Sequence, residues 1–127
     1  EVMQKLRDKG YKQAIVSNKI DSAVQKLAKT YYPFVDIAIG ERDGLQRKPQ
    51  PDMVWAALDE LGVRKETAVY IGDSEVDLAT AKNSGLDCIS VAWGFRDMKM
   101  LESIGAEIIV EQPKDLIDIL DKMQGRQ

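Results

Sequence analysis

Two carboxylates stand four residues apart, directly after a short apolar run. Asp73 and Asp77 follow residues 68–71, and a helical pattern of apolar residues begins beside them. The run predicts a strand buried on both faces, and Gly72 allows the backbone to turn sharply as it leaves the sheet. Asp73 is therefore expected at the carboxyl end of a strand, the edge where open α/β sheets bind ligands. Two carboxylates at that edge could share Mg²⁺, which prefers oxygen ligands.

The same stretch also fits an interpretation without a metal. Ser74 and Asp77 match the S-x-x-[DE] capping box, in which the two side chains satisfy backbone N–H groups at the start of a helix. A cap at Ser74 does not require a second acid beside it, so the presence of Asp73 favours the metal. The residues alone leave both interpretations open.

A hydroxyl and a cation follow two earlier predicted strands. Residues 13–17 end in Ser17, and the polar loop after residues 36–40 contains Lys48. Each could be ordinary, Ser17 as a turn residue and Lys48 as a solvated loop charge. Carboxyl ends of parallel strands share one edge, so we expect both to converge with the acid pair. Together they supply what phosphoryl chemistry needs: a hydroxyl and N–H groups for phosphate oxygens, a lysine to offset charge, and carboxylates for Mg²⁺.

Strands and helices are predicted to alternate along the whole chain. The predicted strands cover residues 13–17, 36–40, 68–71, 87–92 and 107–110, and the predicted helices cover residues 1–9, 18–29, 51–61, 74–84, 97–104 and 113–122. Asn18 is expected to cap the second helix, with Asp21 in the reciprocal position. Strict alternation with short connections is typical of an α/β fold with a parallel sheet and right-handed crossovers.

Composition narrows the classes of function. The chain has 127 residues, 44% of them hydrophobic and 31% charged, with a formal net charge of −3, so we expect one globular domain and no nucleic-acid partner. No apolar run approaches the ~20 residues of a membrane span, and we expect no membrane partner. The absence of histidine excludes Ser-His-Asp and Cys-His catalysis. The single cysteine, Cys88, is expected to be a small buried hydrophobe and fits a reducing cytoplasm.

The order of these residues resembles the haloacid dehalogenase superfamily. Ser17, Lys48 and Gly72-Asp73-x-x-x-Asp77 match its second, third and fourth motifs. Residues 40–52 and 93–97 look like the phosphoglycolate-phosphatase-like branch, and the similarity covers nearly the whole chain. The resemblance implies a Rossmann-like parallel sheet with helices on both faces. It also implies Mg²⁺-dependent hydrolysis of a phosphate monoester, a small phosphorylated metabolite, through an aspartyl-phosphate intermediate.

The resemblance also implies a role for each candidate residue. Ser17 would bind the transferring phosphoryl group, helped by the backbone N–H of Asn18, and Lys48 would neutralise the charge of the nucleophile and the phosphate. Asp73 would ligate Mg²⁺ directly, with Asp77 as a second ligand or as the holder of a metal-bound water. A carboxylate nucleophile splits one slow displacement into two steps.

One departure from the family pattern concerns its first motif, Asp-x-Asp, which carries the nucleophile and the general acid/base. No Asp-x-Asp occurs in these 127 residues. The motif, its central strand and a small helical cap domain would lie before Glu1, where a helix begins without a capping residue. We therefore expect residues 1–127 to be a partial core domain, without its cap domain, and inactive alone. The missing strand would lie between those ending at Ser17 and Gly72, so self-association or a missing N-terminal segment is expected to complete the sheet.

Other classes of protein remain as alternatives. A non-catalytic phosphate- or Mg²⁺-binding α/β module with a regulatory or interaction role predicts that no Asp-x-Asp precedes this segment. A response-regulator receiver has its acid pair at the first strand and its lysine at the last, the reverse of the order here. A dinucleotide-binding domain requires a G-x-G-x-x-G after a strand, which is absent. Arg42, Arg47 and Arg96 are candidates for a pocket rim, although solvated loop arginines are commoner.

Overall fold

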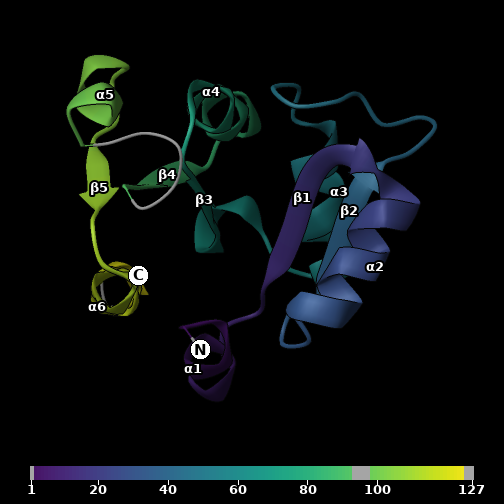
Figure 1. Cartoon of the computed structure of the whole chain (residues 1–127), viewed down its shortest axis with the longest axis horizontal. Coiled ribbons are helices and arrows are strands. Elements are labelled where there is room, and N and C mark those ends of the chain that lie inside the picture. Colours follow the sequence, from purple (N-terminus) through teal and green to yellow (C-terminus); the bar gives the residue numbers. More distant parts are fainter. Residues whose placement is uncertain (1, 93–97, 125–127) are drawn as a thin grey trace. The chain divides into compact units, whose positions relative to one another are not determined.

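The computed structural model describes residues 2–92 and 98–124 and has an α/β fold (Figure 1). Its helices and strands are α1 (Val2–Asp8), β1 (Ala14–Ile20), α2 (Asp21–Tyr31), β2 (Ile37–Glu41), α3 (Asp52–Leu61), the 3₁₀ turn η1 (Lys65–Thr67), β3 (Val69–Gly72), α4 (Glu75–Ser84), β4 (Asp87–Val91), α5 (Met98–Ser103), β5 (Ile108–Val110) and α6 (Pro113–Gln124). The predicted alternation is confirmed. The motif at residues 93–97, with Arg96, lies outside the described residues.

The chain divides into two compact units, Glu1–Arg64 and Lys65–Gln127. In the first, β1 and β2 form a parallel two-stranded sheet with α2 on one face and α3 on the other (Figure 1). Successive side chains of a strand point to opposite faces of the sheet, so those of β2 pack in turn against α2 and α3. Ala38 packs with Val24 and Ala28 of α2. Its neighbour Ile39 packs with α3.

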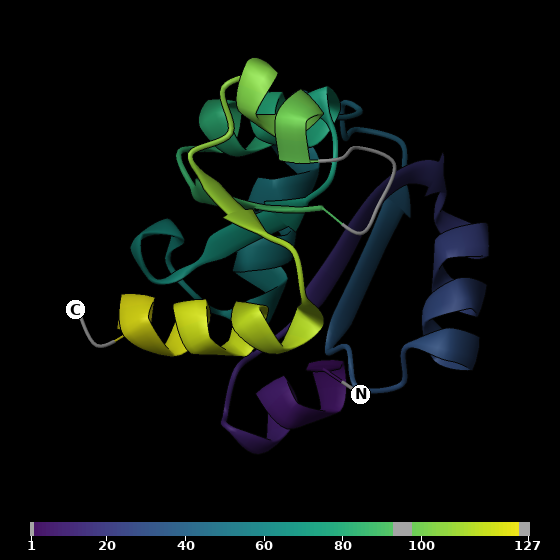
Figure 2. The same ribbon diagram turned by 60° about the vertical axis from the view of Figure 1, so that its left-hand side comes forward.

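The second unit contains the parallel three-stranded sheet β3-β4-β5. Its register pairs Ile71 with Ile89, and Ile89 in turn with Ile108. Helix α4 packs on β3 and β4, and α6 packs on β5; Figure 2 shows β5 leading into α6. Ile89 and Val110 are buried in the core of this second unit. The parallel pairing within each unit confirms the predicted fold class, whereas the single domain over residues 1–127, the absence of a cap domain and the missing central strand stay predictions.

Two helices, α3 and α4, end where the sequence predicts, at residues 61 and 84, and a glycine follows each of them. Gly62 follows α3 with φ of 71°, and Gly85 follows α4 with φ of 80°. This left-handed conformation is accessible to glycine without the steric cost that a side chain imposes. The glycines therefore turn the chain back toward the next strand.

The start of α2 differs from the prediction. Strand β1 continues to Ile20, α2 begins at Asp21, and no side chain caps its first turn. Ser17 and Asn18 therefore both lie within β1. The expectation that Ser17 follows the strand on a loop and the prediction that Asn18 caps the helix are wrong. The physical reason is that the side-chain amide of Asn18 forms hydrogen bonds with the backbone of Lys48 instead.

Cys88 is half-buried rather than fully enclosed. Burial raises the pKa of its thiol, and the nearby carboxylate of Asp77 acts in the same direction. Across residues 2–92 and 98–124, no helix combines the length and apolar character that crossing a membrane requires.

Candidate functional site

Ser17 lies where the pairing of β1 with β2 becomes irregular. Val16 pairs with Ile39 and Ile20 pairs with Glu41, so three residues of β1 face one residue of β2. Such bulges bend a strand and redirect its side chains. Ser17 Oγ accepts a hydrogen bond of 3.2 Å from the backbone N–H of Lys19. This contact uses the oxygen as an acceptor, so it does not compete with the hydroxyl's own donor proton.

Asn18 holds the backbone of Lys48. Asn18 Oδ1 accepts a hydrogen bond of 2.8 Å from the Lys48 N–H, and Asn18 Nδ2 donates one of 3.2 Å to the Lys48 carbonyl. A primary amide has an acceptor and donors on one planar group, so it can satisfy both polar groups of a single residue. The two contacts fix the chain at Lys48 beside β1. The predicted neighbours Ser17, Asn18 and Lys48 therefore lie together in the first unit.

The loop before Lys48 has further anchors. The N–H of Gln46 donates to Asp52 Oδ2 at 3.1 Å, at the start of α3. Arg47 donates from Nη2 to the Asn18 carbonyl at 3.3 Å and lies 3.9 Å from Glu41 Oε2. The Arg47 side chain is 60% exposed, which a solvated loop arginine and a rim residue share, so its place at a pocket rim stays a prediction. The Lys48–Pro49 peptide bond is cis.

Asp77 folds back over the turn between β3 and α4. Its Oδ1 accepts a hydrogen bond of 3.0 Å from the Tyr70 hydroxyl. Its Oδ2 accepts bonds from the Asp73 N–H at 2.9 Å and from Ser74 Oγ at 3.2 Å. Asp77 therefore ties the end of the strand to the first turn of the helix and holds the backbone of Asp73 in place.

Ser74 caps α4, as one of the two sequence interpretations predicts. Its Oγ accepts a bond of 3.4 Å from the N–H of Asp77 and satisfies one backbone donor of the first turn. Asp77 returns a contact to the N–H of Asp73, the residue before the cap. The capping geometry and a metal-binding role are compatible, because capping uses only part of the acceptor capacity of the acid pair.

Gly72 is required by the position of Asp77. A Cβ atom at residue 72 would overlap the Asp77 side chain, including its carboxylate. The absence of a side chain therefore allows Asp77 to lie directly against the end of β3.

Tyr70 is a site residue that the sequence analysis missed. It is buried in β3, and its hydroxyl donates to Asp77. Burial raises its pKa far above the ordinary value, and the negative charge and hydrogen bond of Asp77 add to the shift. The tyrosine therefore stays protonated and remains a donor to Asp77. In the sequence, the one sign of this role is a polar hydroxyl within the otherwise apolar run of residues 68–71.

The acid pair fits a magnesium ion by its chemistry. Both residues supply hard oxygen donors, and Mg²⁺ commonly uses one or two protein carboxylates together with water and phosphate oxygens. Within the described ranges, no group of three or more His, Cys, Asp or Glu residues could hold a metal. Asp77 already accepts three hydrogen bonds, of about four that a carboxylate can accept. The remaining acceptor capacity of Asp77 suits a contact through water, and direct ligation by Asp73 stays a prediction.

The candidate residues lie in two groups. Ser17, Asn18 and Lys48 belong to the first unit, and Asp73 and Asp77 belong to the second. The members of each group lie close together, and the predicted meeting of all these residues at one edge stays a prediction. The guanidinium of Arg42 contacts Asp21 and Glu60, so it is not merely solvated, and its place at a pocket rim stays a prediction.

Comparison with known proteins identifies relatives over most of the chain. The model of the haloacid dehalogenase-like hydrolase family matches residues 1–91. Pyrophosphatase PpaX of Bacillus cereus strain AH820 is 31% identical over 126 residues, which cover 97% of this chain and 58% of that protein. The PpaX of Bacillus mycoides is 29% identical, over 98% of this chain and 59% of the relative.

Solved structures give the same result. A predicted phosphoglycolate phosphatase from Lactobacillus delbrueckii subsp. bulgaricus superposes with a TM-score of 0.91 and 46% identity, over 94% of this chain and 50% of that one. A predicted phosphatase from Clostridium acetobutylicum gives a TM-score of 0.80 and 27% identity, over 94% of this chain and 57% of that one. The chain thus spans between half and three-fifths of the length of these proteins. On its fold, its motifs and the family match, the chain belongs to the haloacid dehalogenase-like hydrolases.

Proposed function

We propose that this protein is a Mg²⁺-dependent phosphatase that hydrolyses small phosphate monoesters through an aspartyl-phosphate, with a nucleophile that lies outside the 127 residues of this chain. The observation that carries the proposal is the pairing of the Asn18 side chain with the Lys48 backbone. It brings the backbone of a lysine beside the bulge of β1 that carries Ser17. Because these groups are what binding and charge neutralisation of a phosphoryl group require, their assembly supports a phosphate site.

In this proposal each residue acts on the phosphoryl group or its surroundings. Ser17 donates its hydroxyl proton to a phosphoryl oxygen, and the Asn18 N–H donates to another. The Lys48 ammonium offsets the negative charge that the nucleophile and the phosphate bring together. Asp73 and Asp77 hold Mg²⁺, which when bound would stabilise the charge on the phosphoryl oxygens.

The proposed substrate is a chemical class and not one named compound. The predicted phosphoglycolate phosphatase among the solved structures supports a small phosphate monoester. The pyrophosphatase relatives support inorganic pyrophosphate as a second candidate. Both place a phosphoryl group on an oxygen leaving group, so the same Ser17 and Lys48 contacts would serve either.

Partners and sheet completion belong to the same proposal. We propose that a small phosphorylated metabolite is the partner, without nucleic acid or membrane. We also propose that a segment outside this chain, or a second copy, pairs with the open edges of β1 and β3. Within the described strands, β1 pairs with β2 alone and β3 with β4 alone, which leaves backbone donors and acceptors for an added strand.

The test uses the protein made from the complete gene. Phosphate release is measured from a panel of small phosphate monoesters and from pyrophosphate, with Mg²⁺ and with EDTA. We expect Mg²⁺-dependent release that Asp73→Asn abolishes by weakening the metal site. Asp87→Asn is the matched control. Asp87 is an exposed aspartate at the start of β4, whereas Asp73 follows the end of the parallel strand β3, so the two lie at opposite edges of the sheet.

The same assay can reject the proposal. Release that persists in EDTA, or near-normal turnover of Asp73→Asn at low Mg²⁺, would remove Asp73 from the mechanism. No release from any compound, in a folded protein that binds inorganic phosphate, would favour the non-catalytic phosphate-binding module.

A further inference from the structure

One short segment makes hydrogen bonds to both ends of a longer loop. We call residues 18–21 the clamp segment and residues 42–48 the lysine loop. Asn18 holds the end of the lysine loop through the Lys48 backbone. Three residues later, Asp21 holds its start through the side chain of Arg42. The first contact is part of the proposed phosphate site, and the second has no role in it.

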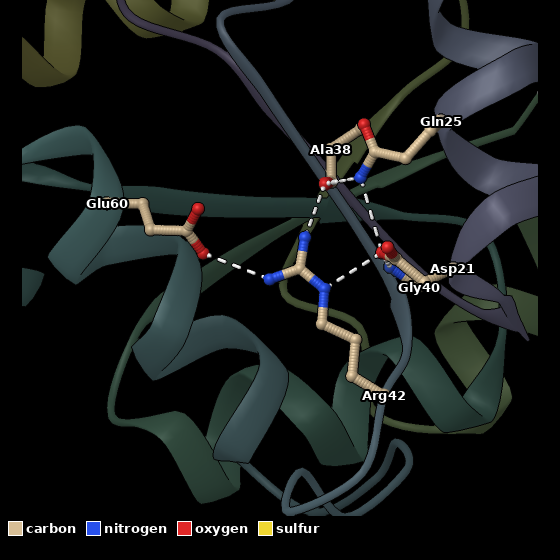
Figure 3. A network of polar contacts seen from close by, with 6 residues as sticks. All are labelled: Asp21, Gln25, Ala38, Gly40, Arg42 and Glu60. Carbon is tan, nitrogen blue, oxygen red and sulfur yellow. Dashed lines mark hydrogen bonds and ion pairs between the residues drawn. The ribbon is translucent and has the colours of Figure 1, made fainter.

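Asp21 is the centre of a polar network (Figure 3). Its Oδ1 accepts hydrogen bonds from the Gly40 N–H at 2.8 Å, from Arg42 Nε at 2.9 Å and from Gln25 Nε2 at 3.2 Å. The Gly40 N–H, followed by Arg42 and Gln25, holds the pKa of Asp21 below its ordinary value. The carboxylate is therefore charged under ordinary conditions and strengthens each contact.

Arg42 connects three elements through one guanidinium. Nε contacts Asp21 at the start of α2, Nη1 contacts Glu60 near the end of α3 at 3.4 Å, and Nη2 donates to the Ala38 carbonyl of β2 at 3.4 Å (Figure 3). The Arg42 side chain is 34% exposed. With its donors directed at protein acceptors, Arg42 is oriented to fix the backbone and not to bind a substrate anion.

The clamp segment also packs against β2 without space to shift. A Cβ atom at Gly40 would lie 2.5 Å from Asp21 Cα and 2.7 Å from the Lys19 carbonyl oxygen. Because Gly40 has no side chain, the two backbones come into direct contact beside Arg42. The start of the lysine loop is therefore held by packing and by a charged hydrogen bond at the same place.

We propose that Asp21 and Arg42 are a positioning pair that fixes the start of the lysine loop and thereby the place of Lys48. They touch no substrate. With both ends of the lysine loop tied to the clamp segment, the backbone of Lys48 is held beside Asn18, the neighbour of Ser17, in one arrangement. The loop spans only seven residues, so release of its start reduces the order at its end. This inference rests on the proposed phosphatase function.

The experiment compares four variants of the protein made from the complete gene: Arg42→Met, Arg42→Lys, Asp21→Asn and Glu60→Gln. Glu60→Gln is the matched control, because it removes one ion-pair partner of the same guanidinium without touching the clamp segment. The readouts are amide hydrogen exchange at Lys48, kcat and KM for the best substrate of the panel, and the affinity for inorganic phosphate by calorimetry.

We expect Arg42→Met and Asp21→Asn to speed exchange at Lys48 by roughly tenfold, the weight of one good hydrogen bond. We expect them to lower kcat by about tenfold or more, because a displaced charge stabilises the transition state poorly. Arg42→Lys keeps a cation but not the planar fork and should recover part of both effects. Glu60→Gln should change each quantity by less than about twofold, as is usual for an exposed ion pair.

Several results would overturn the inference. One is equal behaviour of Glu60→Gln and Arg42→Met, which indicates a general structural role. Another is unchanged kcat in Arg42→Met despite faster exchange at Lys48. Should Arg42→Met fail to fold, Arg42→Lys and Asp21→Asn decide by the same measurements. In a protein without phosphatase activity the proposed function fails, and an unchanged Lys48 exchange rate or phosphate affinity in Asp21→Asn then separately overturns the positioning pair.

Discussion

The side-chain amide of Asn18 makes two hydrogen bonds to the backbone of Lys48, thirty residues further along the chain, at 2.8 and 3.2 Å. The sequence pattern predicts a helix cap for that side chain. A cap satisfies one backbone donor, whereas the observed arrangement satisfies a donor and an acceptor. This change of partner links the segment that carries Ser17 to the loop that carries Lys48.

Replacement of Asn18 tests this link. Asn18→Ala removes both contacts and should lower the free energy of unfolding by about 1 kcal/mol. Asn18→Asp keeps an oxygen acceptor for the Lys48 N–H but loses the donor to the Lys48 carbonyl. Amide exchange at Lys48 should therefore be fast in Asn18→Ala and protected in Asn18→Asp. Equal exchange rates in the two variants would contradict the observed geometry.

Gly72→Ala should destabilise the protein through overlap with Asp77. The expected loss is about 1–3 kcal/mol, the usual cost of inserting a methyl group into a packed site. The affinity for Mg²⁺ should fall as well, because Asp77 must move. Gly10→Ala is the control. Alanine is disfavoured there by the φ of 91° and not by overlap, because nothing lies within 4 Å of the added carbon. Urea denaturation measures stability and calorimetry measures Mg²⁺ binding, and a loss of Mg²⁺ affinity in both variants would count against the overlap.

Tyr70→Phe should loosen Asp77 without opening a cavity. The variant loses the 3.0 Å hydrogen bond to Asp77 Oδ1, at a cost of about 1 kcal/mol in the free energy of unfolding. If Asp77 holds a metal-bound water, the affinity for Mg²⁺ should fall by about tenfold, as for other residues that orient metal ligands. Tyr31→Phe is the control, since Tyr31 is 69% exposed. Unchanged Mg²⁺ affinity in Tyr70→Phe would separate the tyrosine from the metal site.

The Asp21 network gives stability a defined dependence on pH. The folded protein holds the pKa of Asp21 below its ordinary value of 3.8, through Gly40 first and then Arg42 and Gln25. A carboxyl group with a lowered pKa stabilises the fold above its unfolded pKa, and this contribution is lost as pH falls through the folded pKa. The difference in unfolding free energy between wild type and Asp21→Asn should therefore be constant between about pH 5 and 8 and shrink below about pH 4. Urea denaturation at a series of pH values measures it, and a difference that grows toward low pH would be the wrong sign.

The sequence by itself determined the alternation of strands and helices, the ends of α3 and α4 at glycines and the positions of Lys48 and Asp73 after strands. Those features depend on periodicity, on backbone freedom at glycine and on the order of residues along the chain, all of which are local. Only the tertiary structure decided that Asn18 pairs with Lys48, that Tyr70 donates to Asp77 and that Arg42 joins Asp21 and Glu60. Each of these contacts depends on the position of a side chain relative to a partner on another element. A buried polar group takes the best partner that packing brings within reach, and a pattern of residue types does not specify which partner that is.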